Sequence, residues 1–142
     1  MVATELIIHL FERFVWLDEG LQQRLHARGW PDVSRAQSMV MINVVTGTTR
    51  PSDIARRLGV SRQAIHGTIA QMVGKGIVML VPDADDSRHK RLALTAFGEQ
   101  MRHDAQEAMA ALTDRVAGRI GTDRLAALVA ALTAEWGAPD LP

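Results

Sequence analysis

Apolar residues recur along this chain mostly at three- and four-residue steps, the period of amphipathic α-helices. Near the N-terminus the steps run through Leu6, Leu10, Phe14, Leu17, Leu21 and Leu25. The pattern predicts a long first helix, capped by Thr4, that runs to about Arg28 and ends at Gly29. Three further apolar residues lie beside this stripe: Ile7, Phe11 and Val15. Because the stripe is wider than a helix facing one core needs, it indicates a second partner surface.

A second helix is predicted from the spacing of Ser34 and Gln37, which is that of a capping box, and it runs to about Thr46. Its residues are apolar almost all round, so we expect it to be central and buried. After a short turn, a third helix is expected from Pro51 to Leu58, because proline is tolerated at the first helical position.

The segment from residue 50 to 73 has the spacing of a helix-turn-helix motif. Ala55 provides a small residue, Gly59 a sharp turn and Ile65 a branched apolar plug, as two steeply crossed helices require. Ser61 can cap the second helix of the pair, which is expected to run to about Val73.

The two faces of that second helix differ in chemistry. One face is apolar and carries Ile65, Ile69, Met72 and Val73. The other carries Arg62, Gln63, His66 and Gly67. Arginine, glutamine and histidine offer the donors and acceptors that base edges in a major groove can bind, although each can also be an ordinary solvated side chain. Gly67 either permits close approach to a duplex or has no role, and the sequence leaves both interpretations open.

Two apolar-rich runs, Ile77 to Val81 and His89 to Leu94, flank a segment rich in Asp. This arrangement predicts a β-hairpin. Its tip leads into the basic residues Lys90 and Arg91. A helix-turn-helix followed directly by a basic hairpin describes a winged helix, so the fold class is mainly α with a small β-hairpin wing.

The sequence here resembles the MarR family of bacterial transcriptional regulators. The resemblance rests on SDIARRLGVSRQAIHGTIAQMVGKGIV followed by PDADDSRHKRLALTAFGE. The wing signature Asp-x-Arg appears as Asp86 and Arg88, and the strand-to-helix junction appears as Leu94-Thr95-x-x-Gly98. Three positions depart from the family pattern: Arg50 replaces a usual capping Thr, Gly74 stands near an expected acidic residue, and Gly67 interrupts the recognition helix.

Two more helices are expected after the wing. Thr95 can cap a long one, which Gly118 and Gly121 end, and Thr122 can cap the last one. The apolar positions of the last helix are Leu125, Leu128, Val129, Leu132 and Trp136. Because no later element covers this stripe, it predicts a homodimer in which the first and last helices of two subunits interlock. The alternative is that the last helix folds back on its own subunit.

The expected organisation is a single domain over residues 1–142, because the length suits one domain. Residues 1–30 and 96–137 are interpreted as dimerisation helices, and residues 34–95 as the winged-helix DNA-binding lobe. Residues 137–142 are expected to form a tail.

Composition narrows the function classes. The net charge is zero, but residues 50–91 hold eight Lys or Arg against four Asp, and this basic centre suits a phosphate backbone. The chain has no Cys, which excludes disulfides and thiol-based sensing. Its N-terminus lacks the basic start of a signal peptide, and no apolar run is long enough to cross a membrane, so a cytoplasmic protein is expected.

A two-fold dimer would present two recognition helices to one face of double-stranded DNA, so the operator should be near-palindromic. Ser52 and Ser61 lie at helix N-termini, which suit phosphate. Arg62, Gln63 and His66 are the candidates for base edges, with arginine suited to guanine and glutamine to adenine.

The wing supplies further candidate contacts. The resemblance implies that Arg88 enters the minor groove and that Asp86 steadies it by an ion pair. A narrow minor groove also attracts arginine electrostatically. Alternation along the returning strand directs His89 and Arg91 outward and Leu92 and Leu94 inward.

The resemblance also implies a repressor released by a small, often aromatic, ligand bound between the dimer helices and the DNA-binding lobe. The matching region offers His9, Arg13, Trp16, Met39 and Asn43 as ligand contacts. Tryptophan and methionine at helical spacing are also common in cores. Such a ligand would act by favouring a dimer shape whose recognition helices are wrongly spaced for DNA.

Other function classes have less support. The chain has no Gly-rich phosphate loop and no nucleophile motif, so an enzyme is not expected, nor is a cofactor. His103 and Glu107 form an i,i+4 pair that could hold a metal in a metal-responsive regulator, but one His and one carboxylate do not complete a zinc site, so no metal is expected. The remaining alternative is a winged helix that binds proteins and has lost DNA binding.

Overall fold

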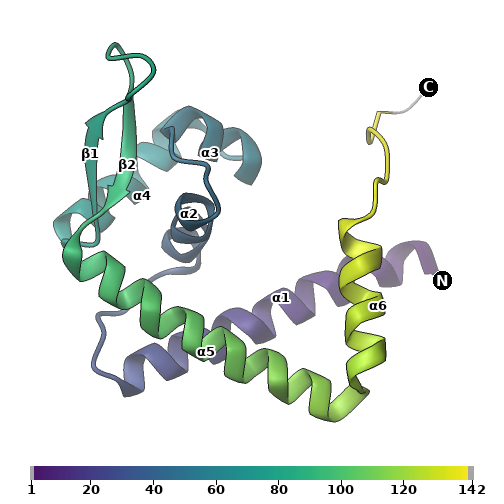
Figure 1. Cartoon of the computed structure of the whole chain (residues 1–142). Coiled ribbons are helices and arrows are strands. Elements are labelled where there is room, and N and C mark those ends of the chain that lie inside the picture. Colours follow the sequence, from purple (N-terminus) through teal and green to yellow (C-terminus); the bar gives the residue numbers. More distant parts are fainter. Residues whose placement is uncertain (1, 141–142) are drawn as a thin grey trace.

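A computed structural model describes residues 2–140 and shows a two-part arrangement (Figure 1). The described residues form, in order, α1 (Val2–Ala27), α2 (Arg35–Val45), α3 (Pro51–Leu58), α4 (Arg62–Gly74), β1 (Val78–Pro82), β2 (Lys90–Leu94), α5 (Ala96–Ile120) and α6 (Thr122–Thr133). The lobe of α2, α3, α4 and the hairpin lies at one end of α5. Helices α1 and α5 cross and pack against each other beneath it, and α6 stands at the far end of α5. The mainly helical winged fold is therefore confirmed.

Most predicted helix starts are present with their caps. Ser34 and Gln37 form the reciprocal capping box of α2. The Ser61 hydroxyl accepts a hydrogen bond from the backbone N–H of Ala64, and Gly59 has the left-handed φ of 66° that ends α3. The prediction for Thr4 was wrong, because α1 is already helical from Val2. Thr4 therefore lies inside the first turn.

The end of the chain differs from the sequence prediction in three places. Gly118 lies within α5, and Gly121, with φ of 95°, separates α5 from α6. Thr122 is the first residue of α6 and not its cap, because Gly121 occupies the capping position without a side-chain bond. Trp136 lies beyond the last helical residue, and its indole Nε1 donates to the carbonyl of Ala131 at 2.9 Å. Residues 141 and 142 of the expected tail lie outside the described residues.

The core of the lobe forms where α2, α3, α4 and the hairpin meet. Its fully buried side chains are Val40, Ile54, Met72, Ile77, Val78 and Leu92. Two residues expected inside are 43% exposed: Ile42 on α2 and Val73 on α4. Helix α2 is thus central but not buried all round, since one side opens onto a cavity described below.

The wing is an antiparallel pair in which Val78 faces Leu94 and Pro82 faces Lys90. Leu92 is buried and its neighbour Arg91 is turned to the other side, as the alternation predicted. The backbone N–H of Leu92 also donates to the carbonyl of Thr49 at 2.8 Å, which attaches the base of the wing to the turn before α3.

The helices outside the lobe leave large apolar surfaces uncovered. None of the residues of α6 is buried, and Leu128, Val129 and Leu132 are each about half exposed. The N-terminal part of α1 is similar, since Ile7 and Phe11 are mostly exposed. The alternative in which α6 is buried against its own subunit is therefore not what the structure shows. Between residues 2 and 140, no helix combines the length and apolar character needed to cross a membrane.

Candidate nucleic-acid interface

Helix α4 separates its apolar and polar faces as the sequence predicted. Ile65 and Ile69 are buried against the lobe, whereas Arg62, Gln63 and His66 are exposed. Gly67 lies on the same exposed face, and an added Cβ there would meet no atom within 4 Å. The side chains of the exposed face do not pack against the lobe, so their polar groups are available to contact base edges in a DNA groove.

The N-termini of α3 and α4 are both on the surface. Ser52, in the first turn of α3, and Ser61, the N-cap of α4, are exposed. The Ser61 oxygen accepts the helix-capping hydrogen bond, so its hydroxyl hydrogen remains able to donate to a phosphate. Backbone N–H groups at these two helix starts add a favourable electrostatic field for an anion.

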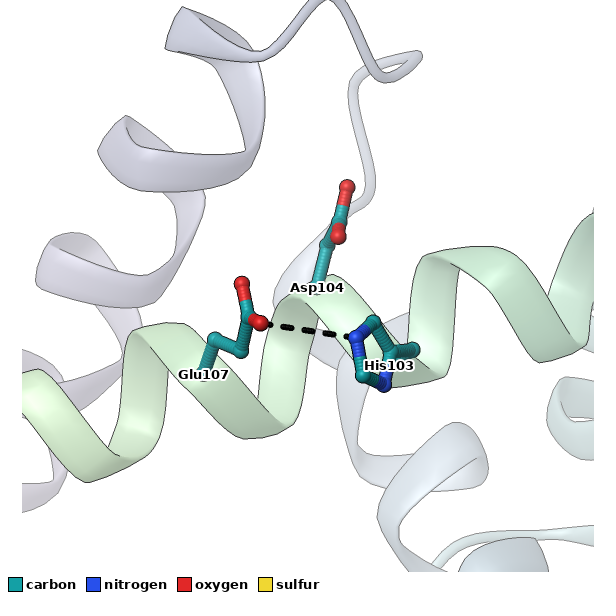
Figure 2. Close-up of side chains that lie close together, drawn as sticks. All are labelled: His103, Asp104 and Glu107. Atoms are coloured by element: carbon teal, nitrogen blue, oxygen red, sulfur yellow. Dashed lines mark ion pairs between the residues drawn. The ribbon is translucent and has the colours of Figure 1, made fainter.

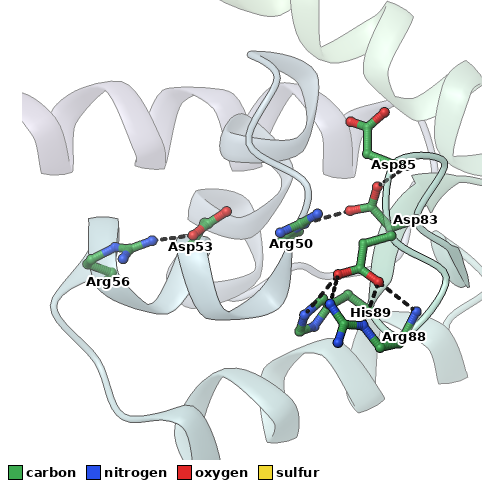
Figure 3. A network of polar contacts seen from close by, with 8 residues as sticks. Arg50, Asp53, Arg56, Asp83, Asp85, Arg88 and His89 are labelled. Atoms are coloured by element: carbon green, nitrogen blue, oxygen red, sulfur yellow. Dashed lines mark hydrogen bonds and ion pairs between the residues drawn. The ribbon is translucent and has the colours of Figure 1, made fainter.

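The wing tip holds Arg88 in a fixed direction (Figure 3). Its Nε donates to Asp86 Oδ1 and its Nη2 to Asp86 Oδ2, each at 3.0 Å. His89 Nε2 lies 3.7 Å from the same carboxylate. The predicted ion pair within the turn is therefore present. The guanidinium of Arg88 holds the pKa of Asp86 below its usual range, and Asp86 in turn raises the pKa of Arg88.

A second arginine, which the sequence marked only as a departure from the family pattern, reaches the wing from the start of α3. Arg50 Nε donates to Asp83 Oδ2 at 2.6 Å. Asp83 also accepts the backbone N–H of Asp85 at 2.9 Å. These two bonds, that of Arg50 first, lower the pKa of Asp83. No local pattern signals the pair, because 33 positions separate its members.

Basic side chains surround the hollow between α3 and the wing. This hollow has a volume of about 700 Å³, and its basic lining residues are Arg50, Arg56, Arg57 and Arg91. Arg56 pairs with Asp53 within α3 (Figure 3), and Arg57 Nε donates to the Asn43 amide oxygen at 3.0 Å. Three aspartates, Asp53, Asp83 and Asp85, line the same hollow, so most of the basic surplus that the sequence showed lies outside it.

A separate apolar cavity of about 470 Å³ lies between the lobe and the helices α1 and α5. Four methionines line it: Met41, Met72, Met101 and Met109. Its charged lining residue is Arg102, which pairs with Glu99 at 3.3 Å. Flexible thioether side chains suit an apolar guest of variable shape. Sequence reasoning missed this cavity, although Met101 and Met109, two helical turns apart, share one face of α5.

The five residues predicted as ligand contacts do not line that cavity. His9 and Arg13 are exposed on α1, and His9 pairs with Glu12 at 3.1 Å. Trp16 lines another hollow, of about 420 Å³, at the crossing of α1 and α5. Met39 is half-buried, and its carbonyl accepts a hydrogen bond from the buried amide of Asn43 at 2.8 Å. The structure therefore does not bring the five side chains together.

Among the described residues, only one group of side chains could together hold a metal ion, and it lies on α5 (Figure 2). His103, Asp104 and Glu107 offer ligand atoms within 4.8 Å of one another, and His103 lies 3.4 Å from Glu107. Both carboxylates already face the guanidinium of Arg28, at 2.9 Å and 2.8 Å. The Trp30 indole Nε1 also donates to Asp104 at 2.7 Å. The chain thus supplies its own cation here, and the cluster joins the end of α1 to α5.

Comparison with known proteins agrees with the overall fold. A model of the MarR family matches residues 32–89, which cover α2 to the wing tip. No curated protein has a significantly matching sequence.

Solved structures share the fold. RV1404 from Mycobacterium tuberculosis is 17% identical with a TM-score of 0.74, covering 100% of this chain and 99% of its own. A MarR-family transcriptional regulator from Rhodococcus sp. RHA1 is 17% identical with a TM-score of 0.70, covering 93% and 92%. Wild-type MarR from E. coli is 22% identical with a TM-score of 0.66, covering 89% and 91%.

Proposed function

We propose that this chain is a DNA-binding transcriptional regulator of the MarR family, acting as a homodimeric repressor that reads a near-palindromic operator and is released by a small apolar ligand. The observation that carries the proposal is the exposed polar face of α4 beside a wing whose arginine is held in one direction. In this arrangement α4 lies in the major groove, with Arg62, Gln63 and His66 at base edges.

The wing and the helix starts would complete the contact. Arg88 reaches the minor groove beside the site read by α4, where the negative potential is concentrated. Ser52 and Ser61 bind phosphates, while His89 and Arg91 add basic contacts on the wing. Such contacts make affinity fall with salt, because each neutralised phosphate releases counterions.

Dimerisation is supported by the uncovered apolar surfaces of α1 and α6. The N-terminal part of α1 and helix α6 both lie on the side of the molecule away from the lobe (Figure 1). Large exposed apolar surface is typical of protein interfaces. A two-fold pair joined there would carry two α4 helices on one side, and these suit half-sites about one DNA turn apart.

The experiment begins with selection of duplexes from a random-sequence pool by the purified protein. Fluorescence anisotropy then measures affinity for the selected duplex and for unrelated DNA at two salt concentrations. A repressor that reads sequence gives a near-palindromic consensus, competitor-resistant binding and a steep salt dependence. Equal and weak binding to both duplexes contradicts DNA reading and favours a protein-interaction module.

The release step is assigned to the methionine-lined cavity, because it lies between the lobe and the helices that would form the dimer. Its lining favours a neutral, apolar or aromatic ligand over a free carboxylate, since Arg102 is already paired. A ligand that binds one relative position of lobe and helices more tightly shifts the population toward it.

The cavity is tested by filling it. Ala105→Phe places an aromatic ring among its lining residues. We expect this variant to bind operator but to resist release by aromatic compounds that release the wild type. Equal release of both proteins would place the ligand elsewhere, and the hollow beside Trp16 would then be the next site to test.

A further inference from the structure

We propose that Arg50 and Asp83 are positioning residues for the wing, and that their ion pair sets where Arg88 meets DNA. This inference rests on the proposed function, because it concerns how the wing binds DNA. It assigns a role to Arg50, the residue that stands where a helix-capping side chain is usual. Arg50 makes no side-chain cap on α3, so its guanidinium is free to reach the wing.

The base and the tip of the wing are held very differently. At the base, Leu92 is fully buried, and its backbone N–H donates to the carbonyl of Thr49. The tip, residues 83–89, lies beyond the paired strands and consists mostly of exposed side chains. A two-stranded hairpin has little stability of its own, so the tip depends on contacts beyond the ladder.

Most hydrogen bonds of the tip join residues within the tip. The Asp83 N–H donates to the His89 carbonyl, and the His89 N–H donates to that of Asp86. Asp86 holds Arg88, and Asp83 holds the N–H of Asp85. These bonds give the tip an internal shape, but they do not fix its position relative to the recognition helices.

The bond from Arg50 to Asp83 supplies that position. It runs from the start of α3 to the first residue of the tip, and its N–O distance is 2.6 Å. The hollow of about 700 Å³ between α3 and the wing means that side-chain packing does not brace the tip there. The Asp83 side chain is only 9% exposed, so water screens this pair less than it screens a fully exposed one.

The two arginine–aspartate pairs form a series along the tip (Figure 3). Arg50 holds Asp83, which begins the tip, and Asp86 holds Arg88 near its far side. The first pair fixes the tip on the lobe, and the second fixes the guanidinium on the tip. A tip that is ordered before binding loses less conformational entropy when it meets DNA.

The test compares two substitutions with the same change of charge. Asp83→Asn keeps an oxygen for the Asp85 N–H but turns an amide toward Arg50. Asp85→Asn removes a carboxylate two residues away, on an exposed side chain. If Arg50 acted only as a phosphate contact, both variants would bind operator as tightly as wild type or tighter, because each removes negative charge near DNA.

The positioning role predicts a split between the variants. On the selected operator, Asp83→Asn should bind roughly two- to five-fold more weakly than wild type, as the loss of one partly exposed ion pair implies. Asp85→Asn should bind as tightly as wild type or tighter. On a duplex trimmed of the flanking base pairs that the wing reaches, Asp83→Asn and wild type should bind equally.

A double variant separates the pair from independent contacts. Arg50→Ala combined with Asp83→Asn should bind no more weakly than Arg50→Ala alone, because both remove one interaction. Additive losses, or Asp83→Asn binding as tightly as Asp85→Asn, would overturn the inference. Circular dichroism and urea unfolding verify that every variant is folded. A wild type without operator preference would instead overturn the proposed function, so the two failures are distinguishable.

Discussion

Arg88 and Asp86 are joined by two parallel hydrogen bonds, Nε to Oδ1 and Nη2 to Oδ2, each 3.0 Å long. The Arg88 backbone N–H donates to the same carboxylate at 3.1 Å. The arginine side chain is nevertheless 85% exposed. Asp86 therefore restricts the direction of the guanidinium without covering it, and the Nη1 group remains free to donate to DNA.

Replacing Arg88 tests whether this group contacts DNA. Arg88→Ala should weaken operator binding by about 1–3 kcal/mol while leaving the dimer intact. Arg88→Lys should recover only part of the loss, because an ammonium cannot form the parallel pair with Asp86. Anisotropy titrations give the affinities, and sedimentation velocity verifies the dimer. Wild-type affinity in Arg88→Ala would remove the wing from the interface.

Two glycines offer a matched test of packing. A Cβ at Gly98 would lie 2.1 Å from the carbonyl oxygen of Ile77, whereas one at Gly67 would meet nothing within 4 Å. Gly98→Ala should therefore cost about 1–3 kcal/mol of unfolding free energy, as overpacking does. Gly67→Ala should add up to about 1 kcal/mol, because alanine favours the helix. Urea unfolding measures both.

The same Gly67→Ala variant decides between the two interpretations of that glycine. If the backbone of α4 approaches the duplex closely at this point, the added methyl group weakens operator binding although the protein is more stable. Unchanged affinity would show that Gly67 has no part in DNA reading. Binding to unrelated DNA is the control, since phosphate contacts alone do not depend on this position.

Trp136 tests the dimer surface. It is 63% exposed and follows the last turn of α6, where its indole Nε1 donates to the carbonyl of Ala131. Trp136→Ala should raise the dimer dissociation constant, because large aromatic side chains dominate interface energies. Sedimentation at decreasing protein concentration measures the shift. A dimer equally stable in the variant would restrict the interface to α1 and the helical part of α6.

The lowered pKa values of two aspartates in the wing predict how its stability depends on pH. The pKa values of Asp83 and Asp86 lie below the ordinary 3.8, chiefly because Arg50 and Arg88 donate to their charged forms. Since the folded values are lowered, the stabilisation is complete above about pH 4 and is lost as pH falls through the folded values. Carboxyl chemical shifts in an NMR titration should therefore have midpoints below 3.8. Midpoints at or above that value would mean that the pairs are absent in solution.

Local signals in the sequence determined much of this protein. The capping residues Ser34, Ser61 and Thr95, together with Gly59, act within a few residues of their own position, so spacing alone placed three helix starts and one helix end. The two apolar-rich runs around the Asp-rich turn are equally local and predicted the wing, whereas the family resemblance implied its internal ion pair. Thr4, Thr122 and Trp136 were misplaced because capping residues and apolar steps also occur inside and beyond helices.

Tertiary structure decided the contacts between distant segments. Arg50 meets Asp83, and Met41 and Met109 line one cavity, only because the helices pack at particular angles that no local period encodes. The same packing separated His9, Trp16 and Asn43, which the family resemblance had grouped into one pocket. Sequence thus determined which faces are polar and which are apolar, because burial follows local periodicity. Packing determined which side chains meet, because that depends on the crossing of whole elements.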